Sequence, residues 1–288
     1  MGPRGVLYGT TLAGGAYGSS CAGPPYGPCG GTVFSLSPPT SEGGAWTEAV
    51  LWSFGGHPGD GIAPNDIVMG GNGVLYGTTE NGGPYYVPPD GGCPDPRGEF
   101  IYCEGTVFSL TPPTEKGGAW AESVLWSFGG TASDGSWPNG VVVGSGGVLY
   151  GTTRWGSKIG VVGTVFALSP PASPGGVWTE QDIHGFLGNG QQLGGGGSPY
   201  GNLLLAGSGV LYGTTFDGGE PGVGAVFALR PPASPGDPWT PAALWDFQLG
   251  SGGQTPAAAL VRGANGVLYG TASGYAEGGV SAVFALAP

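Results

Sequence analysis

The chain has 288 residues, of which 66 are glycine and 28 are proline, and its two lysines and five arginines face nineteen carboxylates for a net charge of −12. This balance excludes binding to DNA, RNA or an anionic membrane surface, because phosphate contacts need clustered cations. No apolar run approaches the roughly 20 residues that span a bilayer, so we expect no membrane insertion. Aromatic residues make up 11% of the chain, which is the apolar material that a disordered chain lacks.

A heptapeptide recurs along the whole chain. It reads GVLYGTT at Gly5–Thr11, Gly73–Thr79, Gly147–Thr153 and Gly209–Thr215, and GVLYGTA at Gly266–Ala272. A site that does chemistry is needed once, whereas a part that must fit its neighbours is needed many times. The recurrence therefore indicates a repeat architecture.

Each repeat predicts four short strands, which we label A to D, separated by glycine and proline. Strand A is a short apolar run after a proline, at Asp66–Met69, Gly140–Val143, Asn202–Leu205 and Ala257–Val261. Strand B is the heptapeptide, which follows a Gly/Asn turn of the kind found in tight hairpins. Strand C has the pattern GTVFSL, at Thr32–Leu36, Thr106–Leu110, Thr164–Leu168, Ala225–Leu229 and Ala282–Leu286. Strand D opens at a tryptophan, at Trp46–Phe54, Trp120–Phe128, Trp178–Phe186 and Trp239–Phe247.

This pattern predicts an all-β fold, a β-propeller of about five four-stranded antiparallel blades in a single domain over residues 1–288. The approximate blades are 5–56, 57–130, 131–187, 188–248 and 249–288. The chain opens at a B strand and closes at a C strand, so 18 strands are expected and one A and one D strand are missing. Three readings fit this incomplete seam: a five-bladed ring, a fragment of a longer protein, or a subunit whose open edge pairs with a neighbour.

The succession of P-x-A-x-L-V, GVLYGTT, GTVFSL and W-x-E-x-V-L-W-S-F resembles the GloVer tandem repeat of bacterial choice-of-anchor proteins. The strand order is also similar to that of Asp-box propellers, although the Asp-box sequence is absent. The resemblance implies a secreted or surface β-structure of unsettled biochemical role. No anchoring or sorting segment and no signal peptide stand in this sequence, so any export signal is expected to lie elsewhere.

Aromatic residues that do not repeat fall in the B–C and D–A loops, which emerge on one face of a propeller. They are Tyr17, Tyr26, Tyr85, Tyr86, Phe100, Tyr102, Trp137, Trp155, Tyr200, Phe216 and Tyr275. Rings of this kind stack on sugars while carboxylates accept hydrogen bonds from hydroxyls. We select Tyr17, Tyr85, Tyr86, Trp137, Trp155, Phe216 and Tyr275 as candidate ligand-binding residues. The alternative is that long loops simply pack on their own aromatics.

Carboxylates and cysteines also gather in these loops. Asp60 and Asp134 occupy matching D–A turns and are weak calcium candidates, with turn formation as the alternative. Otherwise no metal or cofactor is expected. Four cysteines lie in two long loops, and the simplest pairing joins Cys21 to Cys29 and Cys93 to Cys103. Such disulfides belong to an oxidising compartment.

The first functional hypothesis is a non-catalytic extracellular or cell-surface module with a structural or adhesive role, which self-assembles through its open edge. Its partner would be a polysaccharide or a protein surface, including a second copy. The alternative is a carbohydrate-binding propeller that uses the aromatic loop face. A glycoside hydrolase or lyase is less favoured, because it needs two carboxylates about 5–10 Å apart in a pocket and the predicted inner strands offer only Asp66.

Overall fold

The computed structural model describes most of the chain, and the structural statements that follow concern that part. The described residues are 2–18, 30–57, 59–84, 93–94, 100–101, 105–115, 117–130, 134–156, 161–173, 175–188, 197–234, 236–249, 253–274 and 281–287. Side chains at 93–94 and 100–101 are not among them.

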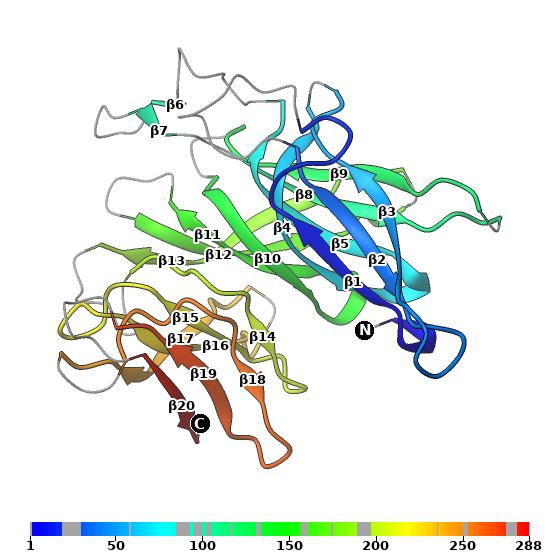
Figure 1. Cartoon of the computed structure of the whole chain (residues 1–288). Coiled ribbons are helices and arrows are strands. Elements are labelled where there is room, and N and C mark those ends of the chain that lie inside the picture. Colours follow the sequence, from blue (N-terminus) through cyan, green and yellow to red (C-terminus); the bar gives the residue numbers. More distant parts are fainter. Residues whose placement is uncertain are drawn as a thin grey trace. The chain divides into compact units, whose positions relative to one another are not determined.

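The described strands form five antiparallel sheets of three, four, four, four and three strands, which confirms the predicted 18 blade strands (Figure 1). Blade 1 holds β1 (Leu7–Thr11), β2 (Thr32–Ser37) and β3 (Thr47–Ser53). Blade 2 holds β4 (Gly61–Met69), β5 (Leu75–Gly82), β8 (Thr106–Thr111) and β9 (Ala121–Ser127). Blade 3 holds β10 (Ser136–Val143), β11 (Leu149–Trp155), β12 (Val161–Ser169) and β13 (Thr179–Leu187). Blade 4 holds β14 (Leu204–Leu205), β15 (Leu211–Thr215), β16 (Ala225–Arg230) and β17 (Thr240–Asp246). Blade 5 holds β18 (Val261–Arg262), β19 (Leu268–Ala272) and β20 (Ala282–Leu286).

Each sheet runs in chain order, so every blade is an up-and-down meander, and the all-β propeller class is confirmed. Blade 1 lacks an A strand and blade 5 lacks a D strand among the described residues, as predicted. A separate hairpin, β6 (Cys93–Pro94) with β7 (Phe100–Ile101), lies in the B–C loop of blade 2. Helix is limited, where the chain is described, to three short 3-10 turns before the heptapeptides: Pro3–Gly5, Gly71–Gly73 and Ser145–Gly147.

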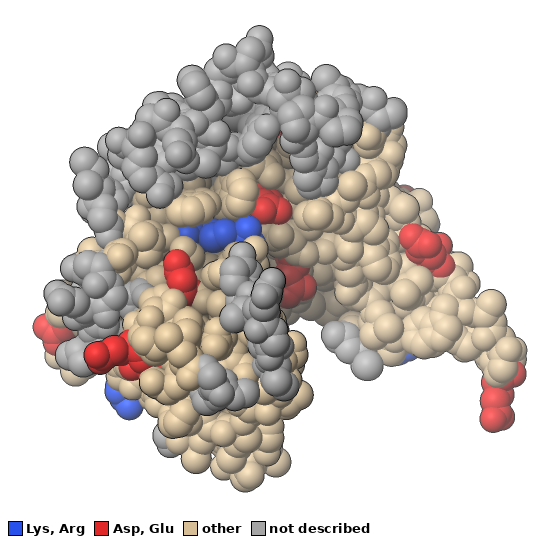
Figure 2. All heavy atoms as spheres, turned by 60° about the vertical axis from the view of Figure 1, so that its left-hand side comes forward, with Lys and Arg blue, Asp and Glu red and all other residues tan. Residues whose placement is uncertain are grey.

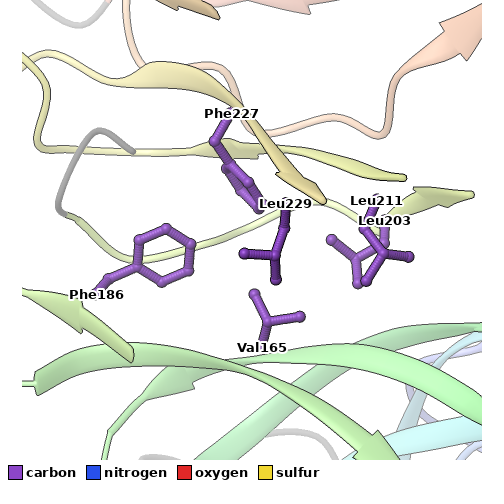
Figure 3. Packing of buried hydrophobic residues seen from close by; sticks show 6 residues of the cluster. All are labelled: Val165, Phe186, Leu203, Leu211, Phe227 and Leu229. Atoms are coloured by element: carbon purple, nitrogen blue, oxygen red, sulfur yellow. The ribbon is translucent and has the colours of Figure 1, made fainter. Parts of the chain in front are cut away.

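The chain divides into two compact units, Met1–Thr131 with blades 1 and 2, and Ala132–Pro288 with blades 3 to 5. Within each unit, neighbouring blades bury their faces against each other. Val165 and Phe186 of blade 3 meet Leu211, Phe227 and other apolar side chains of blade 4, as Figure 3 shows. Blades 1 and 2, and blades 4 and 5, form equivalent clusters. The core therefore lies between sheets, because no single sheet can bury both of its faces.

The tyrosine of the heptapeptide takes part in this packing. Tyr8 of blade 1 meets Trp120 of blade 2 edge-on, with ring centroids 6.4 Å apart. Tyr150 of blade 3 meets Trp239 of blade 4 in the same way, at 5.6 Å. Each tyrosine thus contacts the tryptophan that opens strand D of the next blade, and such edge-to-face pairs add to the stability gained by burial.

The second glycine of the heptapeptide is needed because a side chain at this position would collide with the opposite strand. In all five blades it pairs with the phenylalanine of GTVF, as Gly213 pairs with Phe227 in blade 4. A Cβ on Gly213 would lie only 2.4 Å from Cζ of Phe227. The phenyl ring therefore covers the glycine backbone, and cross-strand packing of this kind compensates for the weak strand propensity of glycine.

We predict that Gly213→Ala destabilises the protein by about 2 kcal/mol, or roughly 4–8 °C in Tm, because the added methyl displaces the buried Phe227 ring. Thermal unfolding followed by circular dichroism measures this change. Gly207 is the matched control, since a Cβ there meets nothing within 4 Å. Equal Tm values for Gly213→Ala and Gly207→Ala would contradict the interpretation, and Gly213→Ala combined with Phe227→Leu should recover part of the loss.

Candidate functional site

Three of the non-repeating aromatic residues come together around one arginine in the second unit. The guanidinium carbon of Arg154, at the end of β11, lies 3.8 Å from the ring centroid of Tyr200 and 5.3 Å from that of Trp137. The ring centroids of Tyr200 and Phe216 are 5.1 Å apart. All four side chains are partly exposed. We call Trp137, Arg154, Tyr200 and Phe216 the aromatic platform.

Hydrogen bonds hold the backbone that bears Tyr200 against its neighbours. Asn139 in β10 donates from Nδ2 to the carbonyl of Pro199 (3.1 Å), and the Gly140 N–H donates to Oδ1 of Asn202 (2.7 Å). The Phe216 N–H donates to the carbonyl of Ser198 (2.8 Å). Hydrogen bonds therefore hold the segment 198–202 to β10 on one side and to the residue after β15 on the other.

Trp137 has an unusual backbone conformation that depends on the fold. Its φ is +57°, in the left-handed region, and it precedes Pro138. Ala63 before Pro64 and Thr255 before Pro256 have φ values of +57° and +46°. The bend thus recurs before three of the four prolines at this position, although Ser198 before Pro199 does not share it, and the indole of Trp137 is not what creates it.

A second candidate site is a cavity of about 260 Å³ in the first unit. Its lining residues are His57, Gly59, Asp60, Pro84, Glu122, Val124 and Ser127. The Asp60 side chain is 1% exposed, and its Oδ2 accepts hydrogen bonds from the N–H groups of Gly55 (2.9 Å) and Gly56 (3.1 Å). Nδ1 of His57 lies 3.9 Å from the same oxygen. Asp60 therefore accepts the hydrogen bonds that close the loop at 55–60.

Burial weakens the acidity of both carboxyl groups in this cavity. Desolvation raises the pKa of Asp60 above its ordinary value, against the opposing effect of its backbone hydrogen bonds. Desolvation, with the neighbouring charge of Asp60, raises the pKa of Glu122 from 4.5 to about 7. Two carboxyl groups in one pocket are what the hydrolase hypothesis requires.

An equivalent arrangement exists in the second unit. Glu180 in blade 3 stands opposite the last leucine of strand C, as Glu122 does in blade 2. Asp134 occupies the same position in its D–A loop as Asp60. Desolvation, with the charges of Asp182 and Asp134, raises the pKa of Glu180 to about 8. Because the carboxylate pair recurs in two blades, we interpret it as part of the scaffold.

The other predicted site residues have different positions. Tyr17 is 41% exposed and lies against Gly56 in the first unit. Trp155 follows Arg154 in β11 and is partly buried. Tyr85, Tyr86, Tyr275, Cys21, Cys29 and Cys103 lie outside the described residues, and only the backbone of Cys93 is described. The disulfides and these three tyrosines therefore stay predictions.

One residue of the candidate sites was missed by sequence reasoning. Arg154 was not singled out, although the residue that follows the heptapeptide varies among the blades as Leu12, Glu80, Arg154, Phe216 and Ser273. Comparing these five residues would have identified Arg154, because it is the one cationic residue among them. The described residues include no group of three or more acidic, His or Cys side chains arranged to hold a metal ion, and calcium binding at Asp60 and Asp134 stays a prediction.

Comparison with known proteins places the chain in a family. The Gloeobacter/Verrucomicrobia repeat matches residues 1–284. The chain belongs to the Gloeobacter/Verrucomicrobia repeat family. This confirms the GloVer resemblance, and no curated protein matches the chain.

Two solved structures are similar to this Gloeobacter/Verrucomicrobia repeat protein. PorZ, a surface component of the type-IX secretion system of Porphyromonas gingivalis, shares 13% identity with a TM-score of 0.50; the match covers 99% of this chain and 39% of PorZ. A protein of unknown function from Dyadobacter fermentans shares 12% identity with a TM-score of 0.46, over 89% of this chain and 68% of its own. At these identities PorZ supports the fold alone. No helix in the described part of the chain is long and apolar enough to cross a membrane.

The carboxyl groups predict how stability depends on pH. Above pH 4.5 the folded chain retains protons that the unfolded chain has released, on Glu122 up to a pH of about 7 and on Glu180 up to a pH of about 8. The free energy of unfolding should therefore fall as the pH rises through this range. We expect a lower Tm at pH 8.5 than at pH 5.

Glu180→Gln tests the assignment, because the amide stays neutral at both pH values. The variant should raise Tm at pH 8.5 by a few degrees and leave Tm at pH 5 nearly unchanged. Glu48→Gln is the control, since Glu48 has the same register in blade 1 and is exposed. If the Tm of Glu180→Gln changes with pH as much as the Tm of the native protein does, the buried carboxyl group is not responsible for the pH dependence of stability.

Proposed function

We propose that this protein is a non-catalytic structural module of the cell surface or extracellular space, which associates with further copies of itself. The observation that supports this is a pair of sheet faces, one on blade 1 and one on blade 5. Each has the residues that neighbouring blades bury against one another, yet no blade of its own unit covers it.

The face on blade 5 contains Val283 and Tyr269. Val283 is 78% exposed, whereas the four valines in its register position are fully buried: Val33, Val107, Val165 and Val226. Tyr269 of the last heptapeptide is 37% exposed. This face therefore has the composition of a blade interface without its partner.

The face on blade 1 has the complementary composition. Leu7 is 36% exposed, whereas its equivalents in the other four heptapeptides are at most 1% exposed: Leu75, Leu149, Leu211 and Leu268. Trp46 is 49% exposed and corresponds to Trp120 and Trp239, which receive tyrosines from the preceding blade. By the same geometry, Tyr269 of one copy would pack on Trp46 of another.

Two further points support a non-catalytic surface role. The pair of Asp60 and Glu122 recurs as Asp134 and Glu180 in the next blade, and Asp60 accepts hydrogen bonds from loop N–H groups, which suits a scaffold better than a general acid. A surface location is in keeping with PorZ, a surface component of a secretion system, and with the oxidising compartment that paired cysteines would need.

The test is the oligomeric state. We predict that the native protein forms concentration-dependent oligomers in light scattering coupled to size exclusion, and that Val283→Asp weakens association about 100-fold, because the interface would bury an unpaired carboxylate. Val177→Asp is the control, since Val177 is 83% exposed and belongs to blade 3, directly before strand D at Trp178. A native protein that stays monomeric at high concentration, or a Val283→Asp variant that associates normally, contradicts the proposal.

A further inference from the structure

Two buried carboxylate oxygens in the first unit make no hydrogen bond with any described residue. They are Oδ1 of Asp60 and Oε1 of Glu122. Both residues line the cavity of about 260 Å³ described above, and the Asp60 side chain is only 1% exposed. In the part of the chain that the structure describes, neither carboxyl group forms an ion pair with a lysine or an arginine. Because an acceptor that is buried without a donor costs free energy, a ligand that brings donors into this cavity would recover that cost.

The repeat fold does not require a carboxyl group at the position of Glu122. Strands C and D pair in the same register in blade 4, where Pro241 takes this position opposite Leu229. In blade 1 the position holds Glu48, which is exposed. Strand pairing alone therefore does not explain a partly buried glutamate opposite Leu110 in blade 2.

The rest of the cavity wall differs between the two blades that contain the pair of carboxyl groups. Ser127 and Val124 of blade 2 correspond to Gly185 and Asp182 of blade 3. Ser127 provides a hydroxyl group, and Val124, which is 37% exposed, provides an apolar surface. The pair of carboxyl groups recurs, but its combination with a hydroxyl group and an apolar wall is present in blade 2 and not in blade 3.

The lining indicates a cation that donates several hydrogen bonds. An ammonium group has three donors and no acceptor, which matches Oδ1 of Asp60, Oε1 of Glu122 and the hydroxyl group of Ser127. A guanidinium group fits less well, because it prefers both oxygens of one carboxylate, and Oδ2 of Asp60 already accepts hydrogen bonds from Gly55 and Gly56. Calcium takes six to eight oxygen ligands, whereas the described residues form no group of three metal-binding side chains.

The size and surroundings of the cavity favour an organic cation. Val124 and Pro84 line it together with the carboxyl groups, so methylene groups next to the ammonium would contact apolar surface. The chain has a net charge of −12, and Figure 2 shows few cationic groups on the face in view. A field of this sign raises the local concentration of cations.

We propose that this cavity binds a primary ammonium group on a short aliphatic stem, with the ammonium donating hydrogen bonds to Asp60, Glu122 and Ser127. The stem lies against Val124 and Pro84. This goes beyond the proposed structural function, because the cavity belongs to the first unit and includes neither of the two sheet faces on blades 1 and 5.

The test is a titration of the full-length protein with n-butylammonium, followed by amide NMR spectra at pH 8 and 0.15 M salt. This pH lies above the pKa of about 7 that burial and the charge of Asp60 give to Glu122, while the alkylammonium keeps its charge. We expect saturable shifts of the Gly55 and Gly56 amide signals, with a Kd of about 1 mM. Tetramethylammonium, which has the charge without N–H donors, and n-butanol, which has the stem without the charge, should bind at least about tenfold more weakly.

A lysine side chain and a free alkylamine share this ammonium group, so the titration is repeated with acetyl-lysine methylamide. Tighter binding than that of n-butylammonium identifies a polypeptide as the source of the group. Equal or weaker binding identifies a free amine. Both results support the ammonium site.

Glu122→Gln removes the charge and keeps the shape of the side chain, so it should weaken n-butylammonium binding at least about tenfold. Pro241 shows that the fold accepts a neutral residue at this position. Ser127→Ala should weaken binding about fivefold, and it gives an independent variant should Glu122→Gln unfold. Glu48→Gln is the matched control, because it makes the same charge change at the equivalent, exposed position of blade 1 and should leave the Kd unchanged.

Three results would overturn the proposal. They are no saturable shift with n-butylammonium, equal affinity for tetramethylammonium or n-butanol, and an unchanged Kd in folded Glu122→Gln and Ser127→Ala variants. An equal loss of affinity in Glu48→Gln would show that binding follows the net charge and not the cavity. The result is independent of the oligomeric state, because Val283→Asp lies in the second unit and leaves the residues of the cavity unchanged.

Discussion

The structure depends on the contact between the backbone of a glycine in strand B and the phenyl ring opposite it in strand C. That contact fixes the register of strands B and C, because a shift by one residue would place a side chain where the ring must lie. Register in turn decides which side chains face the preceding blade and which face the following one. With Gly213 under Phe227, Leu211 and Leu229 meet blade 3, and Val226 meets blade 5. One small residue thus sets the orientation of a whole sheet.

Most of this architecture could be predicted from the sequence, because repetition reveals constraints that a single copy hides. The B and C strands were located nearly to the residue, since both the heptapeptide and GTVF recur in register. The A strands were harder. They are only two residues long at Leu204–Leu205 and Val261–Arg262, and β4 and β10 begin before their prolines, at Gly61 and Ser136. Short strands beside proline have few ladder hydrogen bonds, so pattern alone does not fix their ends.

The candidate sites were less accessible to sequence reasoning. The common face of the B–C and D–A loops was predicted from topology, and the structure joins Trp137, Tyr200 and Phe216 as that topology implies. It places Tyr17 in the first unit instead, beside Gly56. The partnership of Asp60 with Glu122 did not follow from the sequence, because it depends on which side chains turn into the cavity. Composition and spacing contain no information on that orientation.

The bend before proline in strand A has a consequence for how such repeat proteins diversify. The backbone there has a positive φ with alanine, tryptophan and threonine in three blades, but not with Ser198 before Pro199 in blade 4, so no single type of side chain creates it. The repeat therefore accommodates side chains at this position that differ as much in size as alanine, serine, threonine and tryptophan. New recognition properties can arise at that one position in one blade while the others continue to maintain the fold.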